Sequence, residues 1–474
     1  DAFAVIKNAM LTGQEETPSA VGLYLLSGQG TEAKGPALYG AAVSGGSRIY
    51  FFDAEAEGTP ADYLVRKLGS LRRQAAAARG SMLALFDIKA LYPYLDVDAE
   101  EFDEHGIRLE GCFDALLGAY LCNPLKNDYT AEDCAGEYLG VTPPSWIQLF
   151  GKKTAAGIAE SGDEEEMEKL RQYAIRMAAL LAEAAPRICG RLREEGMWKL
   201  YTDMELPLSY ILYDMQRIGV RILPEALRQY SAELGEQAAS LERQIYEETG
   251  EEFNIASPKQ LGEVLFDKMG LPGGKKTKTG WSTAADVLGG LAPEHPVVRH
   301  ILEYRAVTKL KSTYADGLTA YVGPDLRIHT SFNQTITATG RISSNEPNLQ
   351  NIPMRTEMGR RIRKAFVPCE GYCFTDSDYS QIELRILAGM SGDEGLMEAY
   401  RENRDIHAST AARVFHVPFE EVTPLQRRNA KAVNFGIVYG QQAFGLAQNL
   451  GIGFKEAQEM IDRYFEAYPG VRAF

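Results

Sequence analysis

The sequence predicts a multidomain protein of mixed class, in which an α/β unit is followed by mostly helical and α+β units. The chain has 474 residues, and single hydrophobic cores stop growing at roughly 250 to 300 residues. Its composition, 45% hydrophobic and 24% charged, is that of an ordinary globular protein. The spacing of apolar residues changes along the chain from short β-type runs to long helical stretches, which indicates separate domains.

The first segment, residues 1–190, alternates β-rich runs with helical stretches and is therefore predicted to be α/β. An acidic cluster opens residues 163–185, followed by Leu, Tyr, Met and Ala at helical spacing, which predicts a helix that closes this domain. The predicted strands are residues 21–26, 37–43, 48–52 and 82–86.

Residues 191–320 have an almost wholly helical pattern. Leucines and tyrosines recur three or four residues apart over 224–249, as in an exposed helical hairpin, and Ser257-Pro258 is typical of a helix start. A loop rich in Gly and Lys is expected at 273–280. Its lysines are Lys275, Lys276 and Lys278.

Beyond residue 321, β-prone runs at 327–332 and 372–378 are mixed with helices, which favours an α+β unit. The net charge of −15 is uneven along the chain. It is −17 over residues 1–253, +7 over residues 254–368 and −5 over residues 369–474. A basic segment of this kind indicates a surface for a polyanion, although a solvated face explains the charge equally well.

The strongest chemical pattern lies in a helix predicted to begin at Thr423-Pro424, an N-cap followed by a first-turn proline. Two cations and two aromatics recur every four residues and share one face of that helix. Cations can bind adjacent phosphates of a triphosphate, and rings one and two turns later can meet a sugar and a base. An amphipathic helix with a buried aromatic end is the alternative. The four residues are Arg427, Lys431, Phe435 and Tyr439.

Two acidic or polar segments complete the pattern. Asp378 ends the β-prone run 372–378, and an aspartate at a strand end is well placed to bind Mg²⁺, although it could instead cap a helix starting at Ser380. His407 lies near the start of another predicted helix, where an imidazole and the helix dipole can bind phosphate. Residues 338–353 are rich in amides and hydroxyls, which suit minor-groove acceptors or, alternatively, a polar surface loop.

Taken together, these segments resemble the family A DNA polymerases of the bacterial polymerase I type. The resemblance is specific over residues 195–474 and weak over 1–190. It runs through residues 257–262, 275–280, 309–314, 339–341, the Asp378 segment and 427–440.

The resemblance implies an RNase H-like exonuclease-type domain at 1–190, followed by the parts of a right-hand polymerase. These are a mostly helical thumb at 191–320, an incomplete palm at 321–395 and incomplete fingers at 396–474.

The resemblance also implies the site residues. Asp378 and the Tyr379 carbonyl would hold metal, with two Mg²⁺ ions in the complete site. Glu383 would exclude a ribose 2′-hydroxyl, and Lys431 would bind phosphate and donate a proton. The nucleotide-binding set is Tyr379, Gln381, Ile382, Glu383, His407, Arg427, Lys431, Phe435 and Tyr439, and the DNA-binding set is Lys275, Lys276, Lys278, Lys309, Lys311, Arg341, Asn348 and Asn351.

The activity implied is template-directed addition of deoxynucleotides to a primer 3′-hydroxyl with release of pyrophosphate. The implied partners are primer-template DNA and deoxynucleoside triphosphates, and a monomer is expected. A cytoplasmic location is also expected, because the sequence has no apolar run of 18 or more residues.

Two departures from the family pattern qualify these expectations. The exonuclease site of the family needs four carboxylates. The first strand here reads Val21-Gly22-Leu23-Tyr24 and lacks the acids that the family carries there. Met177, four residues after Tyr173, occupies a position where the family has an aspartate. No proofreading is therefore expected. The family's later His-Asp-Glu segment, which completes the palm metal site, is absent from a sequence that ends at Phe474, so the alternative function is a catalytically incomplete DNA-binding fragment.

Overall fold

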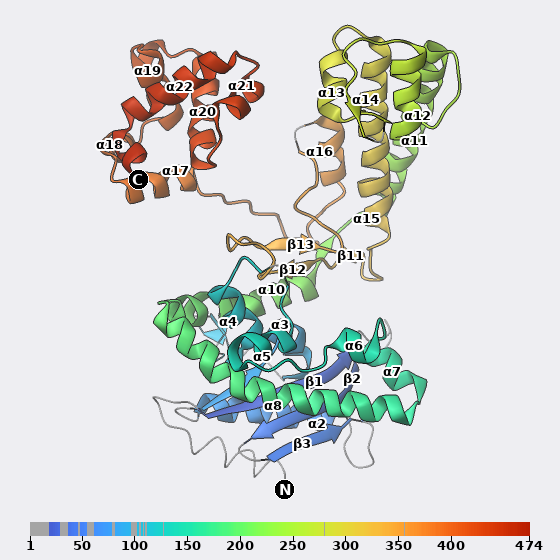
Figure 1. Cartoon of the computed structure of the whole chain (residues 1–474), viewed down its shortest axis with the longest axis vertical. Coiled ribbons are helices and arrows are strands. Elements are labelled where there is room, and N and C mark those ends of the chain that lie inside the picture. The colour runs from blue at the N-terminus through green and yellow to red at the C-terminus, as the bar shows by residue number, and fades with distance from the viewer. Residues whose placement is uncertain are drawn as a thin grey trace. The chain divides into compact units, whose positions relative to one another are not determined.

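The computed structural model divides the chain into two compact units, Asp1–Cys373 and Phe374–Phe474 (Figure 1). The residues that the structure describes are 19–28, 37–45, 48–54, 61–77, 81–95, 102–103, 106–107, 109, 111–126, 128–278, 280–354 and 356–474.

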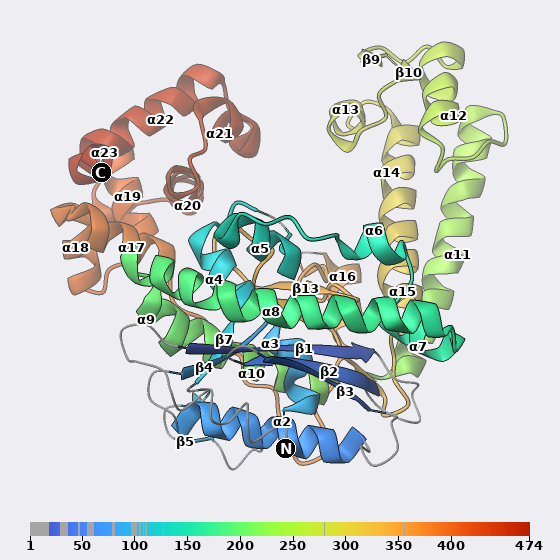
Figure 2. The ribbon, with the colours of Figure 1, turned by 60° about the horizontal axis from the view of Figure 1, so that its bottom comes forward.

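A five-stranded mixed sheet organises the beginning of the first unit. Its strand order is β3-β2-β1-β4-β7; β2 is antiparallel to β1 and β3, and the β1–β4 and β4–β7 pairs are parallel. The four predicted strands are confirmed as β1 to β4. Helix α8 covers one face of the sheet and α2 the other (Figure 2). The bounds are β1 Ser19–Gly28, β2 Ala37–Gly45, β3 Arg48–Asp53, β4 Ser81–Leu85, β7 Cys112–Asp114, α2 Ala61–Ala77 and α8 Glu164–Glu194.

Helix α8 begins where the acidic cluster predicts, because the Asp163 side chain accepts hydrogen bonds from the backbone N–H groups of Glu165 and Glu166. It lies so close to β1 that a Cβ on Gly22 would be 1.8 Å from the Ala178 carbonyl oxygen, so this position requires glycine. Shorter elements surround the sheet: α3 Ile88–Leu91, η1 Tyr92–Tyr94, β5 Phe102–Asp103, β6 Gly106–Ile107, α4 Ala115–Cys122, α5 Ala131–Leu139, α6 Trp146–Phe150 and α7 Ala155–Ser161.

Two long helices, α11 (Pro224–Thr249) and α14 (Pro296–Lys309), pack along one another in the next part of this unit (Figure 1). The helical pattern at 224–249 is confirmed, but these residues form the single helix α11 and not a hairpin; Ser257 caps α12 as predicted. The expected loop at 273–280 instead contains the short strands β9 and β10. The remaining elements are α9 Trp198–Leu200, η3 Tyr201–Glu205, α10 Leu206–Ile218, α12 Pro258–Gly262, η4 Glu263–Lys268, β9 Lys276–Thr277, β10 Gly280–Trp281, α13 Ala285–Leu291, η5 Leu310–Asp316 and α15 Gly317–Thr319.

Short antiparallel pairs link these helices to the sheet domain. β8 pairs with β11 and β12 with β13, so the predicted strand at 327–332 is present as two shorter ones. The Tyr120 hydroxyl donates to the Thr337 carbonyl at 2.6 Å, and Lys89 Nζ donates to the Phe332 carbonyl. The bounds are β8 Val220–Arg221, β11 Arg327–Ile328, β12 Ser331–Asn333, β13 Ser343–Asn345 and α16 Glu357–Arg363.

The second unit is helical and has its own core, in which Leu384, Val433, Tyr464 and Tyr468 are buried. Its elements are α17 Ile382–Ser391, α18 Glu394–Arg401, α19 Ile406–Phe415, η6 Phe419–Glu421, α20 Pro424–Val438, α21 Ala443–Leu450, α22 Phe454–Ala467 and α23 Pro469–Ala473.

The prediction of a strand at 372–378 is wrong. These residues have no regular secondary structure and are exposed, and no strand among the described residues pairs with them. A β-prone sequence needs a hydrogen-bonding neighbour to form a strand, and local propensity cannot supply one.

Among the helices that the structure describes, none has the length and apolar character needed to cross a bilayer.

Candidate active site

The candidate site is built on α20, whose start is fixed by the predicted cap. Thr423 and Gln426 form a reciprocal capping box, and Pro424 occupies the first turn. Ala430, Val433 and Gly436 are buried in the core, whereas Arg427, Lys431 and Tyr439 are exposed and Phe435 is half-buried. The aromatic end of the stripe is therefore not core: Tyr439 keeps 61% of its surface exposed.

Arg427 is held at the start of the stripe by Asp405. Arg427 Nε lies 2.7 Å from Asp405 Oδ2, and Asp405 Oδ1 caps α19 by accepting from the backbone N–H groups of His407 and Ala408 at 2.9 and 3.0 Å. Partial burial opposes ionisation of Asp405, but hydrogen bonds from Ala408 and Arg427 outweigh it and lower the pKa of this carboxyl. A single carboxylate thus fixes both the guanidinium and the helix start.

His407 lies near the start of α19, as predicted, but its environment differs from the expectation. The residue is 2% exposed, and its ring centroid lies 5.7 Å from that of Phe435. Burial lowers the pKa of His407 to about 4; Arg427 and Lys431 act in the same direction and Asp405 acts against it. The imidazole is therefore neutral at pH 7 and can offer a hydrogen-bond donor but not a positive charge.

The far end of the stripe meets α17. The Tyr439 hydroxyl donates to Glu383 Oε1 at 3.3 Å, so the predicted sugar gate and the predicted template contact touch one another. Lys431 Nζ lies 5.9 Å from the centre of the Phe435 ring, within cation–π range.

The segment that leads into α17 carries Asp378. Asp378 does not cap a helix: α17 begins at Ile382, and its N-cap is Gln381, which has a left-handed backbone with φ 54°. Asp378 and Tyr379 are exposed, and Tyr379 keeps 78% of its surface in solvent. The Asp378 carboxylate and the Tyr379 carbonyl are hard oxygen donors of the kind that Mg²⁺ prefers.

The predicted DNA-binding lysines lie in two different environments. Lys275, Lys276, Lys278 and Lys309 are exposed, and Lys276 Nζ lies 4.8 Å from the centre of the Trp281 ring. Lys311 is different, because its Nζ contacts Asp316 Oδ2 at 2.7 Å and Ser231 Oγ at 2.9 Å.

The predicted minor-groove residues lie on the polar segment around β13. Arg341, Asn348 and Asn351 are exposed; Asn348 Oδ1 accepts from Gln350 N at 3.0 Å, and the Asn351 carbonyl accepts from the Tyr314 hydroxyl at 2.5 Å. One of these contacts is local to the segment, and the other ties it to η5.

Two acids of the sheet domain, Asp87 and Asp114, serve as helix N-caps. Asp114 is buried and accepts from the backbone N–H groups of Asp87, Ile88 and Leu116 at 3.0, 2.8 and 2.9 Å. Burial, with the nearby Asp87, raises the pKa of Asp114 to about 7. The cavity beside them is about 60 Å³ and is also lined by Lys89.

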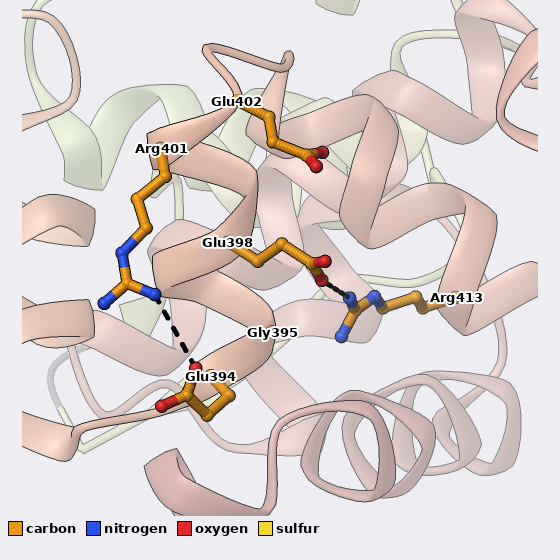
Figure 3. Close-up of a pocket in the computed structure, with 6 residues that line it drawn as sticks. All are labelled: Glu394, Gly395, Glu398, Arg401, Glu402 and Arg413. Carbon is orange, nitrogen blue, oxygen red and sulfur yellow. Dashed lines mark ion pairs between the residues drawn. The ribbon is translucent and has the colours of Figure 1, made fainter.

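Another charged groove, of about 530 Å³, lies on the second unit (Figure 3). Its cations are paired, since Arg401 lies 3.8 Å from Glu394 and Arg413 lies 3.9 Å from Glu398. Because these charges largely neutralise one another and no predicted site residue lines the groove, it is not the candidate site. Its lining residues are Glu394, Gly395, Glu398, Arg401, Glu402 and Arg413.

Sequence reasoning missed three residues that organise the site: Asp405 as the partner of Arg427, and Thr410 and Asn434 beside His407. The Asp405 cap has a sequence signal, an aspartate just before a helical pattern. Asn434 and Thr410 lie inside helices at buried positions. A buried polar residue indicates a hydrogen bond, but the sequence does not identify its partner.

Comparison with known proteins identifies the family of this chain. Residues 224–474 match the family model for DNA polymerase family A. DNA polymerase I of Geobacillus stearothermophilus is 49% identical over 374 residues, which are 78% of this chain and 42% of that protein; DNA polymerase I of Streptococcus pneumoniae serotype 4 is 51% identical with the same coverage. The chain thus spans about two fifths of the length of these curated relatives.

A solved structure is also similar over nearly the whole chain. The POL domain of Pol1 from M. smegmatis, in complex with DNA primer-template and dNTP, has a TM-score of 0.80 and 35% sequence identity, covering 99% of this chain and 76% of that one. The family model alone covers more than half of the sequence. The chain belongs to DNA polymerase family A.

Proposed function

We propose that the chain carries the nucleotide and primer-template sites of a template-directed DNA polymerase, which adds deoxynucleotides to a primer 3′-hydroxyl and releases pyrophosphate. The observation that carries this proposal is the stripe on α20: two exposed cations, one oriented by Asp405, followed by two aromatics that end against Glu383. The relatives named DNA polymerase I, and the similar domain solved with primer-template and dNTP, support it.

The charged end of the stripe would bind the triphosphate. Arg427 and Lys431 would neutralise charge that develops on the phosphates as the primer hydroxyl attacks the α-phosphate. His407 would add a neutral N–H donor, and Lys431 can also donate a proton to the departing pyrophosphate. Phosphate binding requires Arg427 to share its guanidinium between Asp405 and the ligand.

The aromatic end would select the nucleotide. Phe435 would pack on the deoxyribose and Tyr439 would stack near the template base. Glu383, with Gln381 and Ile382 at the start of α17, would lie beside the sugar, where the carboxylate excludes a 2′-hydroxyl.

Asp378 and the Tyr379 carbonyl would hold Mg²⁺, because both offer oxygen ligands in an exposed segment. When bound, the metal lowers the pKa of the attacking hydroxyl and stabilises the leaving oxygens. Two ions are proposed for the complete site.

Primer-template DNA would be bound by the first unit. Phosphates would be contacted by four exposed lysines, Lys275, Lys276, Lys278 and Lys309. Lys311 would contribute less to phosphate binding, because its ammonium group is paired with Asp316. Arg341, Asn348 and Asn351 would contact the primer end and minor groove. The proposed domains are exonuclease-like 1–190, thumb 191–320, palm 321–395 and fingers 396–474.

The sheet domain is proposed to lack proofreading activity. The strand order of its sheet is compatible with an RNase H-like exonuclease fold. Position 177 holds a fully buried methionine instead of an acid, and Asp87 and Asp114 serve as helix caps. Both observations argue that this domain has a structural role.

The experiment that tests the proposal measures primer extension and DNA binding on the same preparation of the 474-residue chain, with Mg²⁺ and all four dNTPs. Extension directed by the template supports a polymerase. Tight binding of primer-template without extension, and without dNTP binding to that complex, would instead support the DNA-binding fragment. Loss of dNTP binding in Lys431→Met but not in Arg428→Met, an exposed cation one residue from Arg427, would localise the site.

A further inference from the structure

A line of four buried polar side chains runs behind the stripe, from the end of α22 to the start of α19. The Tyr468 hydroxyl lies 3.0 Å from Thr410 Oγ1, Thr410 Oγ1 lies 3.1 Å from Asn434 Oδ1, and Asn434 Nδ2 lies 3.0 Å from His407 Nδ1. Tyr468, Thr410 and Asn434 are fully buried and His407 is 2% exposed. Only the last of the four, His407, is a residue to which the proposed function gives a role.

The donors and acceptors of this line can point in only one direction. The Tyr468 phenol is fully buried, and within the described part of the chain its hydroxyl is hydrogen-bonded only to Thr410. A buried phenol proton without an acceptor is costly, so Tyr468 donates to Thr410. Thr410 has one proton of its own and gives it to Asn434 Oδ1, which can only accept.

The direction at Asn434 fixes the proton on the histidine. With Oδ1 accepting from Thr410, the amide Nδ2 faces His407 and donates to Nδ1, so Nδ1 carries no proton and the ring proton is on Nε2. Reversing the amide would put the proton on Nδ1, but Asn434 would then donate to Thr410, and either the Thr410 or the Tyr468 hydroxyl proton would be left without an acceptor in this line.

Charged residues of the stripe lie close to the His407 ring. Arg427 and Lys431 are close enough to depress protonation of the ring, together with its burial, and Phe435 packs against it. Among the described residues none accepts a hydrogen bond from Nε2.

We propose that Asn434 is a positioning residue, which holds His407 as the Nε2–H tautomer so that the ring presents one neutral donor, beside Arg427 and Lys431, to an oxygen of the bound triphosphate. This inference rests on the proposed function for its ligand but not for the tautomer. A neutral donor adds a hydrogen bond without placing a third positive charge next to two others.

The decisive variant is Asn434→Asp, which keeps the shape of the side chain but replaces the donor by a carboxylate that can only accept. His407 should then place a proton on Nδ1 to meet it. Imidazole ¹⁵N–¹H correlation spectra distinguish the two tautomers, and the chain has only six histidines, so the His407 signals can be assigned with His407→Gln. Asn449→Asp, on the exposed face of α21, is the matched change of charge.

The second readout is affinity for Mg·dATP, measured by calorimetry on the chain bound to primer-template. Wild type should show the Nε2–H tautomer, and Asn434→Asp should show the neutral Nδ1–H tautomer together with binding about tenfold weaker, as expected for loss of one hydrogen bond to a charged group. Asn449→Asp should change neither.

A second pair of variants guards against misfolding of the first. Thr410→Val removes the hydroxyl that orients Asn434, whereas Thr410→Ser keeps it; the serine variant should retain the tautomer and the dATP affinity that the valine variant loses. An Nδ1–H tautomer in wild type, or a reversed tautomer with unchanged dATP affinity, would overturn the inference. Absence of dATP binding in wild type would refute the proposed function and the ligand assigned here, whereas the tautomer would still test the role of Asn434.

Discussion

Asp114 in the sheet domain and the stripe on α20 show that polar side chains can serve either the fold or a ligand. Asp114 is buried, and three backbone N–H groups satisfy its carboxylate, with a cavity of only about 60 Å³ beside it. Lys431 and Tyr439 project from a helix whose opposite face is core, and they remain exposed. The hydrogen bonds of Asp114 are met inside the fold and leave it no capacity for a ligand, whereas an exposed and oriented charge is available to one.

The largest expected effect concerns the pH dependence of stability and Asp114. Because its pKa is raised from 3.8 to about 7, the folded state binds this proton more tightly than the unfolded state. The free energy of unfolding contributed by Asp114 therefore falls as pH rises from 4 to 7. Asp114→Asn cannot ionise, so the stability difference between variant and wild type should move in favour of the variant by at most about 4 kcal/mol between pH 4 and pH 8.

Urea unfolding at several pH values measures this difference. Asp316→Asn is the control of opposite sign, because the hydrogen bond from Lys311 lowers the pKa of Asp316, so its contribution to stability is present at neutral pH and lost as pH falls. Parallel pH profiles for wild type and Asp114→Asn would show that Asp114 is not a buried acid of this kind.

The next effect concerns Lys431, the exposed cation of the stripe. Removing a charge-assisted contact with phosphate should weaken Mg·dNTP binding by about 30- to 100-fold, corresponding to roughly 2 to 3 kcal/mol. Lys431→Met keeps most of the apolar length of the side chain, so stability should barely change. Arg428→Met removes a cation from the same helix and should leave the affinity within about twofold, as is usual for an exposed charge outside a contact. Equal losses in both variants would mean that general electrostatics, not the stripe, binds the nucleotide.

A smaller effect is expected at Glu383, whose carboxylate accepts from Tyr439. Glu383→Ala should weaken discrimination between dATP and ATP by about tenfold, since a single repulsive contact is removed, worth roughly 1.4 kcal/mol. Tyr439→Phe removes the hydrogen bond but keeps the carboxylate, so it should retain most of the discrimination. Competition between the two nucleotides for the DNA-bound chain measures both variants; unchanged preference in Glu383→Ala would contradict the gate.

The smallest effect extends the comparison to DNA binding. Lys309 is exposed, whereas Lys311 is paired with Asp316. Lys309→Ala should weaken primer-template binding and lower the slope of log affinity against log salt by about 1, as for the loss of one phosphate contact. Lys311→Ala should change this slope less, because its charge is already matched within the fold. A larger change for Lys311 would show that DNA displaces Asp316.

The sequence by itself determined the elements that depend on neighbouring residues. The caps at Asp163, Ser257 and Thr423, and the turn-by-turn spacing from Arg427 to Tyr439, were predictable because caps and helical faces are set within a few residues. The strands β1 to β4 were predictable for the same reason, from short β-prone runs between turns.

Only the tertiary structure decided features that depend on residues far apart in the chain. Residues 372–378 form no strand because strand formation needs a partner. The protonation state of His407 follows from its burial and from Asn434, and the orientation of Arg427 follows from Asp405, 22 residues away. Burial and long-range hydrogen bonds arise from packing of whole helices, so no local pattern in the sequence can specify them.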